Sequence, residues 1–167
     1  RKKGIMLNPA NFPSNMWVDV PIKDMLQQKL RLPITVDNGA NAAVLAEHLF
    51  GIGQITDNIS YFHCGMGIRT GTISSGTIIR AINDYEDAFG HMVIDIHGDL
   101  CHCQNRGCIE TYCSMPSITK KFKKSLLQGR FTSVNKPFDE IDFLDIRAAA
   151  EENDELAQAA ITSAATI

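Results

Sequence analysis

Hydrophobic side chains recur along this chain with a helical period in some segments and with an extended pattern in others. Apolar residues that return every three or four positions predict helices. Five segments have this spacing: residues 20–30, 42–50, a stretch that opens at residues 114–116, 143–152 and 154–167. Pro21 suits the first turn of the first helix, Gly51 ends the second, and Asp154 is a good N-cap for the last.

Short runs with strand composition alternate with turn residues in the first half of the chain. These runs cover residues 4–7, 33–36, 58–64 and 68–74, with a short return over 77–80. Gly65-Met66-Gly67 and Ser75-Gly76 separate the last three runs, which indicates a β-hairpin unit. Three polar or Pro-rich stretches are expected to be loops: residues 8–17, 83–87 and 130–137. Strands grouped together and then joined to helices indicate an α/β fold of mixed sheets.

Composition places the chain among ordinary globular proteins. Of its 167 residues, 44% are hydrophobic and 21% are charged, which suits one domain or two small lobes. A formal charge of -3 provides no general basic field for nucleic acid. Four lysines are clustered, and we expect them to form the solvated face of a helix: Lys120, Lys121, Lys123 and Lys124.

The chain has no sign of membrane insertion or secretion. No apolar run approaches the roughly 20 residues needed to cross a bilayer, and the first residues lack the apolar core of a signal peptide. Five cysteines, an odd number at metal-ligand spacing, favour a reducing cytoplasm. The chain opens inside an extended segment and ends in an Ala-rich helix without a stop signal, so we expect a fragment of a longer protein.

The segment between Phe89 and Glu110 contains residues typical of a zinc site. One imidazole and three thiols occur there at short intervals: His91, Cys101, Cys103 and Cys108. Zinc prefers nitrogen and sulfur donors in a tetrahedral arrangement, and four such ligands leave no position for water. We therefore predict a closed, structural zinc site, with Gly107 assisting a tight turn. The alternative is a group of reduced, half-buried thiols, which is our interpretation of Cys64 and Cys113.

Two asparagines follow the short strand predicted over residues 33–36 and precede a helix. In α/β folds, polar side chains at the carboxyl end of a buried strand converge on ligand sites. Asn is also among the best N-cap residues. Asn38 therefore has two open interpretations, helix capping and ligand binding, whereas Asn41 is expected to cap or to pack.

Four stretches occur in an order that resembles one known family. They are I-T-V-D-N-G-A-N-A-A-V-L-A-E, G-M-G-I-R-T-G-T-I-S-S-G, F-G-H-M-V-I-D and C-H-C-Q-N-R-G-C-I-E. They resemble the repressor, open reading frame and kinase (ROK) family, which contains sugar kinases and sugar-responsive transcription factors. The resemblance implies an α/β, actin-like (ribonuclease-H-like) ATPase fold with two lobes. Residues 1–56 would end the N-terminal lobe, and residues 57–167 would form part of the C-terminal lobe.

The chain departs from the pattern of the family's kinases where catalysis would be expected. The resemblance places the general-base Asp of the sugar kinases at Gly39, which has no side chain to accept a proton. Asp37 would be displaced by about 7 Å along an extended chain, so we do not assign it the role of the base. A Glu that binds sugar hydroxyls in the family corresponds to Ala88. We therefore predict no catalytic residue.

The glycine-rich phosphate loop of the family is also altered. It usually has the sequence Gly-Thr-Gly-Ile-Gly, whereas this chain has Gly65-Met66-Gly67-Ile68-Arg69. The two glycines, Gly65 and Gly67, allow backbone N–H groups to approach phosphate. Met66, however, lacks the Thr hydroxyl, and Arg69 adds bulk. We expect a degenerate phosphate loop and no role for ATP.

Three residues match family positions that contact sugar: Asn38, His91 and Glu110. His91 can ligate zinc through one ring nitrogen and donate a hydrogen bond from the other, and the metal would fix its orientation. Glu110 has an alternative interpretation as a carboxylate that is favoured at a helix N-terminus by the helix dipole.

These observations favour the sugar- or sugar-phosphate-sensing domain of a ROK-family transcriptional regulator, without kinase activity. One alternative is a ROK sugar kinase that phosphorylates a hexose or an N-acetylated aminosugar with ATP. Another is a zinc-stabilised interaction module without a small ligand. The resemblance also implies DNA binding through a helix-turn-helix that this fragment lacks, and a homodimer or higher homo-oligomer.

Overall fold

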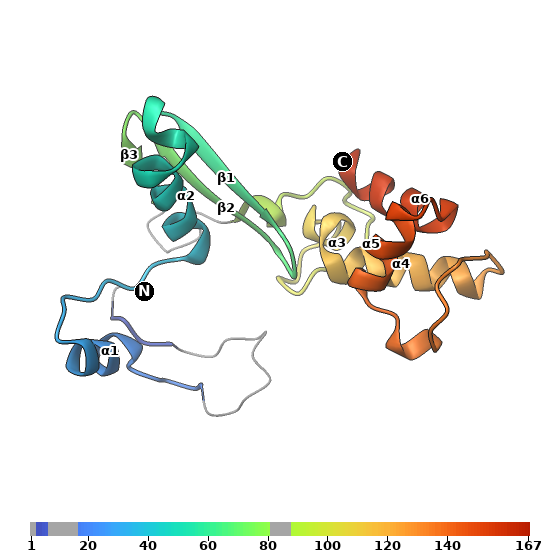
Figure 1. Cartoon of the computed structure of the whole chain (residues 1–167), viewed down its shortest axis with the longest axis horizontal. Helices are drawn as coiled ribbons and strands as arrows, with labels where there is room; N and C mark the ends of the chain where they lie inside the picture. Colours follow the sequence, from blue (N-terminus) through green and yellow to red (C-terminus); the bar gives the residue numbers. More distant parts are fainter. Residues whose placement is uncertain (1–2, 7–16, 81–87) are drawn as a thin grey trace. The chain divides into compact units, whose positions relative to one another are not determined.

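The computed structural model describes residues 3–6, 17–80 and 88–167, and the chain divides into two compact units. The first unit falls within residues 1–59 and 71–84, and the second within 60–70 and 85–167. Figure 1 labels the helices and strands, whose order is α1 (Ile22–Leu30), α2 (Gly39–Phe50), η1 (Ile52–Ile55), β1 (Ile59–Cys64), β2 (Ile68–Ser74), β3 (Thr77–Ile78), η2 (Ala88–His91), α3 (Glu110–Cys113), α4 (Met115–Leu127), η3 (Phe138–Glu140), α5 (Phe143–Glu151) and α6 (Glu155–Ala165). The combination of a small sheet with helices confirms the predicted α/β class.

The three strands form one sheet with the order β1-β2-β3. β2 and β3 are antiparallel, with Ile73 opposite Ile78. Between them, Ser75 and Gly76 have φ angles of 51° and 71°, in the left-handed region that a two-residue hairpin turn of this kind requires. The predicted hairpin is confirmed, although β3 ends at Ile78 rather than at residue 80.

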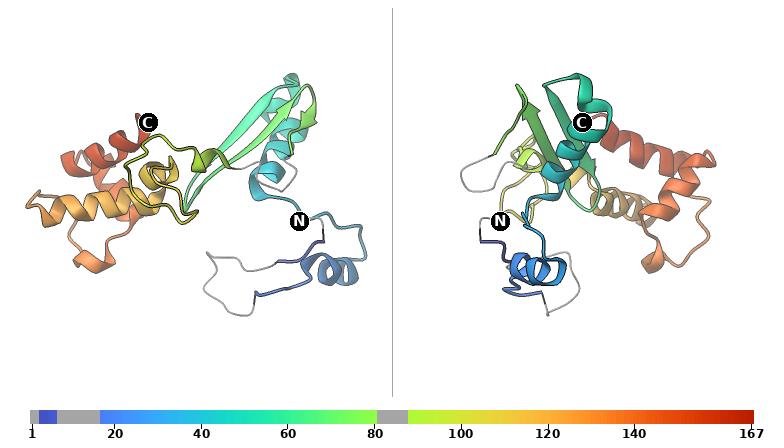
Figure 2. Two further views of the ribbon diagram at one scale, coloured as in Figure 1. Left: turned by 180° about the vertical axis from the view of Figure 1, so that it is seen from behind. Right: turned by 60° about the vertical axis from the view of Figure 1, so that its left-hand side comes forward.

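In the first unit, α2 lies alongside β2 (Figure 2). A Cβ at Gly71 of β2 would overlap the carbonyl oxygen of Ala40, so the absence of a side chain lets the helix backbone approach the strand. Val44 of α2 is fully buried. The helix begins at Gly39, three residues earlier than predicted, because Asn38 caps it.

Two predicted strands are not formed as expected. Residues 33–36 adopt no regular structure and are half-buried or exposed, so the prediction of a buried strand is wrong. Pro33 has no backbone N–H to donate, and no described segment pairs with these residues. Over residues 4–7, the described residues form a single antiparallel bridge between Met6 and Val20.

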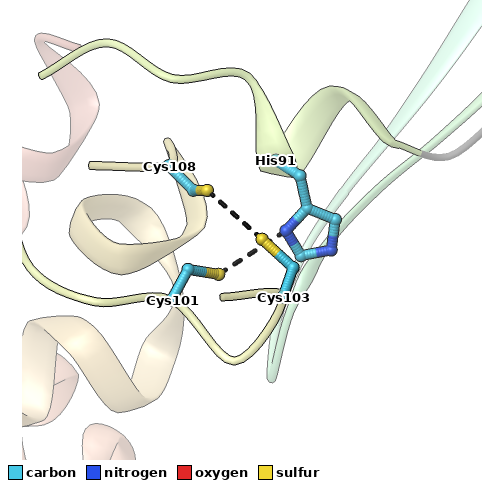
Figure 3. A group of neighbouring side chains, drawn as sticks. All are labelled: His91, Cys101, Cys103 and Cys108. Atoms are coloured by element: carbon cyan, nitrogen blue, oxygen red, sulfur yellow. Dashed lines mark hydrogen bonds between the residues drawn. The ribbon is translucent and has the colours of Figure 1, made fainter. Parts of the chain in front are cut away.

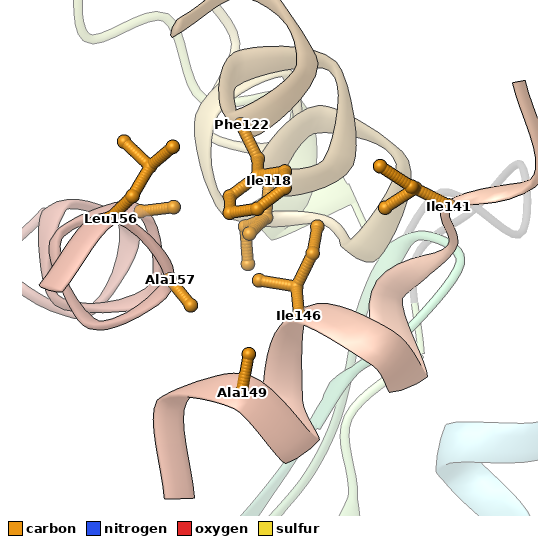
Figure 4. Close-up of a cluster of buried hydrophobic side chains, with 8 residues drawn as sticks. Ile118, Phe122, Ile141, Ile146, Ala149, Leu156 and Ala157 are labelled. Carbon is orange, nitrogen blue, oxygen red and sulfur yellow. The ribbon is translucent and has the colours of Figure 1, made fainter. Parts of the chain in front are cut away.

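Apolar side chains from α4, α5 and α6, with Ile141 from the segment before α5, form the core of the second unit, where these helices pack side by side (Figures 1 and 4). The buried members are Ile118, Phe122, Ile141, Ile146, Ala149, Leu156, Ala157 and Ala160. Complete burial of a side chain such as Phe122 or Ile146 contributes about 1.5–3 kcal/mol. The predicted apolar face of α4 is therefore confirmed, with Leu126 at its half-buried edge.

Local hydrogen bonds fix the starts of these three helices. Ser114 caps α4. Asp142 and Asp145 form a capping box at the start of α5, in which each side chain accepts a hydrogen bond from the other residue's N–H. Asp154 accepts a hydrogen bond from the N–H of Ala157 at 2.8 Å and so caps α6, as predicted. Because such signals are local, the sequence predicts these helix starts well.

The remaining predictions concern loops and membrane segments. Residues 130–137 are irregular, as predicted. Of the loops predicted over residues 8–17 and 83–87, only Trp17 lies within the described residues. Among those residues, no helix has both the length and the apolar character needed to cross a membrane. The division into lobes at residues 56 and 57 stays a prediction.

Replacing Asp154 with Ala should lower the free energy of unfolding by about 1–2 kcal/mol at pH 7, because it removes the cap of α6. Burial raises the pKa of Asp154, but hydrogen bonds from Ser133, Ala157 and Thr132 outweigh this effect and lower it overall. The carboxylate therefore stabilises the fold above about pH 4, and this stabilisation is lost as the pH falls through its folded pKa.

Urea unfolding at pH 7 and pH 3 measures this effect. The stability difference between wild type and Asp154→Ala should be smaller at pH 3. Asp139→Ala, at an exposed carboxylate, is the matched control and should change little at either pH. An equal difference at both pH values would contradict the role assigned to the Asp154 carboxylate.

Candidate functional site

A tight backbone turn in the second unit carries the three predicted cysteine ligands, and His91 lies at the end of η2. The N–H of Cys101 donates to the carbonyl of Asn105 at 2.8 Å, and the N–H of Gln104 donates to that of Cys101 at 2.9 Å. Gly107 has a φ of 64°, and a Cβ there would overlap the carbonyl oxygen of Asp95. A residue with a side chain does not fit at this position, in agreement with the predicted glycine-assisted turn.

Four potential ligand atoms lie close together at this turn (Figure 3). His91 Nδ1 is 3.6 Å from Cys101 Sγ, and Cys103 Sγ is 3.6 Å from Cys108 Sγ. The four atoms all lie within 4.8 Å of one another. Tetrahedral zinc with Zn–S bonds of about 2.3 Å separates its sulfur ligands by about 3.8 Å. The predicted residues are therefore brought together at a spacing that fits zinc.

The electrostatics of the thiols also suit a bound cation. Burial raises the pKa of Cys108 to about 12, and the adjacent thiols of Cys103 and Cys101 act in the same direction. A backbone hydrogen bond from Asn105 instead lowers the pKa of Cys103. A bound metal would favour the ionised form of Cys108, because it stabilises the thiolate that burial disfavours.

The other two cysteines lie outside this cluster. Cys64 is exposed rather than half-buried, so that part of the prediction is wrong: it lies at the end of β1 and not in a packed interior. Cys113 is half-buried, as predicted, and its Sγ donates to the carbonyl oxygen of Ala164 at 3.3 Å.

Glu110 is buried at the start of α3 and is held by the first two residues of β2. Its Oε2 accepts hydrogen bonds from the N–H of Ile68 at 2.7 Å and from Arg69 Nη1 at 3.3 Å. Its Oε1 lies 3.2 Å from Nδ1 of His102. A Cβ at Gly67 would lie 2.6 Å from Oε2, so this glycine allows the carboxylate to reach the turn. Glu110 is therefore anchored by specific partners and not only by its place at a helix start.

His102 is a residue of the site that the sequence analysis missed. Its ring centroid lies 5.0 Å from that of His91. His91, His102 and Glu110 form a second group whose potential ligand atoms lie within 4.8 Å of one another. The available signal was the position of His102 between Cys101 and Cys103, which ties it to the metal cluster.

The predicted phosphate-loop positions form a turn without a hydroxyl. The N–H of Gly65 donates to the carbonyl of Gly67 at 3.2 Å. Met66, between them, is exposed and lines a groove of about 810 Å³. The groove lies between α4 and residues 138–144, and Phe138 and Ile141 also line it. The second position of the loop thus contributes an apolar side chain.

In the first unit, the start of α2 is held by an ion pair. Arg80 Nη1 and Nη2 lie 2.8 Å and 2.5 Å from the two carboxylate oxygens of Asp37. Oδ1 of Asp37 also accepts from the N–H of Asn38 at 2.8 Å and from Asn41 Nδ2 at 3.3 Å. Burial raises the pKa of Asp37, but these hydrogen bonds, that of Arg80 first, outweigh it and hold the pKa well below its usual range.

The asparagines at this position have structural roles. The side chain of Asn38 accepts the N–H of Ala40 at 2.7 Å and caps α2, which was one of its two predicted interpretations. Asn41 is fully buried, which agrees with the prediction that it packs. Gly39 lies at the first position of the helix, and a Cβ there would meet no atom within 4 Å.

Comparison with known proteins places these features in one family. The family model described as ROK family matches residues 1–167. The xylose repressor of Bacillus subtilis is 35% identical over 111 residues, which cover 66% of this chain and 29% of the repressor. The glucokinase of Thermotoga maritima is 33% identical over 134 residues, which cover 76% of this chain and 42% of the kinase.

A solved structure gives the same result for the fold. The crystal structure of a ROK family transcriptional regulator, a homolog of the E. coli MLC protein, superimposes with a TM-score of 0.79 and 28% sequence identity. The match covers 95% of this chain and 39% of the regulator. The chain thus spans less than half the length of these relatives. The predicted resemblance is confirmed: the chain has part of the actin-like ATPase fold and belongs to the ROK family.

Proposed function

We propose that this chain is the effector-sensing part of a ROK-family transcriptional regulator, that zinc stabilises it, and that it does not phosphorylate sugar. Membership of the family alone does not separate a regulator from a kinase, because its relatives include proteins named as repressors and as glucokinases. The separation rests on the chemistry that the residues of this chain can perform.

The observation that carries the proposal is the arrangement at the start of α2. The position that the family resemblance assigns to the general base is Gly39, which has no group to accept a proton. The nearby carboxylate of Asp37 is paired with Arg80 through both oxygens. Its lowered pKa makes it a weak base, because an efficient general base has a pKa near the working pH.

The rate argument follows from these two residues. Loss of a positioned general base typically lowers a rate by about 10²–10⁴-fold. The phosphate-loop positions add to the loss, since Met66 offers no hydroxyl and the N–H of Ile68 donates to Glu110. A chain with these features is suited to bind a ligand and to leave it chemically unchanged.

The proposed ligand is a sugar or a sugar phosphate, contacted by His91 and Glu110 beside the metal cluster. Ile68 and Arg69 donate to Oε2 of Glu110, whereas Oε1 has only His102 Nδ1 nearby, at 3.2 Å. A ligand hydroxyl would therefore donate to Oε1. The third predicted contact, Asn38, caps α2, so any ligand contact it makes would be additional.

Zinc would crosslink the segments that carry its ligands and would add positive charge at the site. His91, Cys101, Cys103 and Cys108 would hold it, and its charge would favour the thiolate forms of the cysteines. The ligand would then be bound by side chains of the chain itself. The metal would orient the imidazole of His91. The carboxylate of Glu110 is buried and held in place by its own partners.

In a regulator, ligand binding would act by shifting a population of conformations. A ligand changes such an equilibrium only if it binds one conformation more tightly than the other. Closure around a sugar would change the geometry presented to attached DNA-binding elements. DNA binding and cytoplasmic location are parts of this proposal, supported by the repressors among the relatives. Homo-oligomer formation is also proposed, on the family resemblance alone.

A coupled assay for ATP-dependent phosphorylation of glucose, xylose and N-acetylglucosamine tests the absence of catalysis. The full chain should give no turnover above the protein-free background. Gly39→Asp is the matched control for the missing base, and it should fold normally because the added Cβ meets no atom within 4 Å. It too should remain inactive, because the phosphate loop lacks its hydroxyl. Turnover by the wild type would contradict the proposal.

Metal analysis of the purified chain should give about one zinc per molecule. Cys103→Ser should release the metal and lower the melting temperature, because structural zinc contributes its binding free energy to folding. Cys64→Ser, at an exposed cysteine outside the cluster, is the matched control and should retain both zinc and stability. A wild-type chain that is free of zinc and melts like Cys103→Ser would count against the metal site.

A further inference from the structure

Arg69 lies beside the proposed sugar contact and changes what a ligand would meet there. Its Nη1 is 3.3 Å from Glu110 Oε2 and 3.2 Å from the carbonyl oxygen of Ile68. These two contacts fix the orientation of the guanidinium group. A Cβ at Gly67 would lie 3.2 Å from the same nitrogen, so the glycine makes space for the pair. The guanidinium group of Arg69 is therefore held in a defined position beside Glu110.

The two partners of this ion pair differ in exposure. The side chain of Glu110 is 9% exposed, whereas that of Arg69 is 33% exposed. The carboxylate lies inside, where its Oε2 accepts from the N–H of Ile68 and its Oε1 lies 3.2 Å from His102 Nδ1, and the guanidinium lies on the solvent side. A molecule that approaches from solvent thus meets a cationic donor before it meets the acceptor.

The charge of the pair sets the kind of ligand that fits. Glu110 and Arg69 together are neutral, and His102 adds no negative charge. A buried carboxylate alone would repel an anion, but Arg69 offsets this repulsion. Guanidinium groups bind carboxylate and phosphate through two parallel N–H···O bonds between opposite charges, whereas a sugar hydroxyl offers them a single uncharged acceptor oxygen.

From this geometry we infer that Arg69 is the specificity-determining residue of the site and that the effector is an anionic sugar derivative. The anionic group, a phosphate or a carboxylate, pairs with Arg69, while a hydroxyl of the sugar donates to Oε1 of Glu110. This inference rests on the proposed sensing function and narrows its ligand from sugars in general to sugar phosphates and sugar acids.

Isothermal titration calorimetry of the full chain tests the inference with matched ligands. The first set is glucose, glucose 6-phosphate and glucuronate, and the second is N-acetylglucosamine and its 6-phosphate. An anionic member of at least one set should bind at least about tenfold more tightly than its neutral partner. The two anionic arms of the first set distinguish phosphate from carboxylate.

Three variants assign the preference to Arg69. Arg69→Gln should abolish it, and Arg69→Lys should retain part of it, because the ammonium group keeps the charge without the guanidinium fork. Arg147→Gln, at an exposed arginine on α5 that pairs only with Glu151 in the described contacts, should bind like wild type. Zinc content and the melting curve check that each variant folds. If Arg69→Gln does not fold, the reduced preference for anions expected of Arg69→Lys tests the inference.

The outcomes separate this inference from the proposed function. Neutral sugars that bind as tightly as their anionic partners would overturn the role of Arg69 and leave sugar sensing intact. A preference for anions that persists in Arg69→Gln would also overturn it. Binding of no sugar in either set would count against both the inference and the sensing function.

Discussion

The convergence of three thiols and one imidazole on a single point is the constraint on which the site in the second unit depends. The loop that carries them cannot be held by a hydrophobic core of its own, because its large apolar side chains are exposed: Met92, Val93, Ile94, Ile96 and Leu100. Backbone hydrogen bonds and the proposed metal must then supply its rigidity. Through this loop, the metal would position both His91 and the buried Glu110.

A second physical theme is the neutralisation of carboxylates by arginines within each unit. Arg80 pairs with both oxygens of Asp37 in the first unit, and Arg69 pairs with Glu110 in the second. A carboxylate that accepts several strong hydrogen bonds is stabilised in its ionised form and is a weaker base. For Asp37, whose pKa is lowered, this pairing disfavours proton transfer. The contact of Arg69 with Glu110 instead holds the buried carboxylate in place beside the proposed ligand.

The success of sequence analysis depended on how local each signal is. Helices α4 to α6 were predicted from apolar periodicity and from caps such as Asp154, which act within one turn. The strand expected over residues 33–36 failed because a strand exists only with a partner, which sequence pattern alone does not supply. The four metal ligands were visible because three lie within eight residues. The contact between Arg69 and Glu110, 41 residues apart, had no signal in the sequence.

X-ray absorption at the zinc K-edge tests the central claim most directly, because it measures the ligands of the metal rather than its presence alone. The account predicts three sulfur neighbours at about 2.3 Å and one nitrogen neighbour at about 2.0 Å. This result would place the metal among Cys101, Cys103, Cys108 and His91. A first shell dominated by oxygen, or one with fewer than three sulfur atoms, would contradict it.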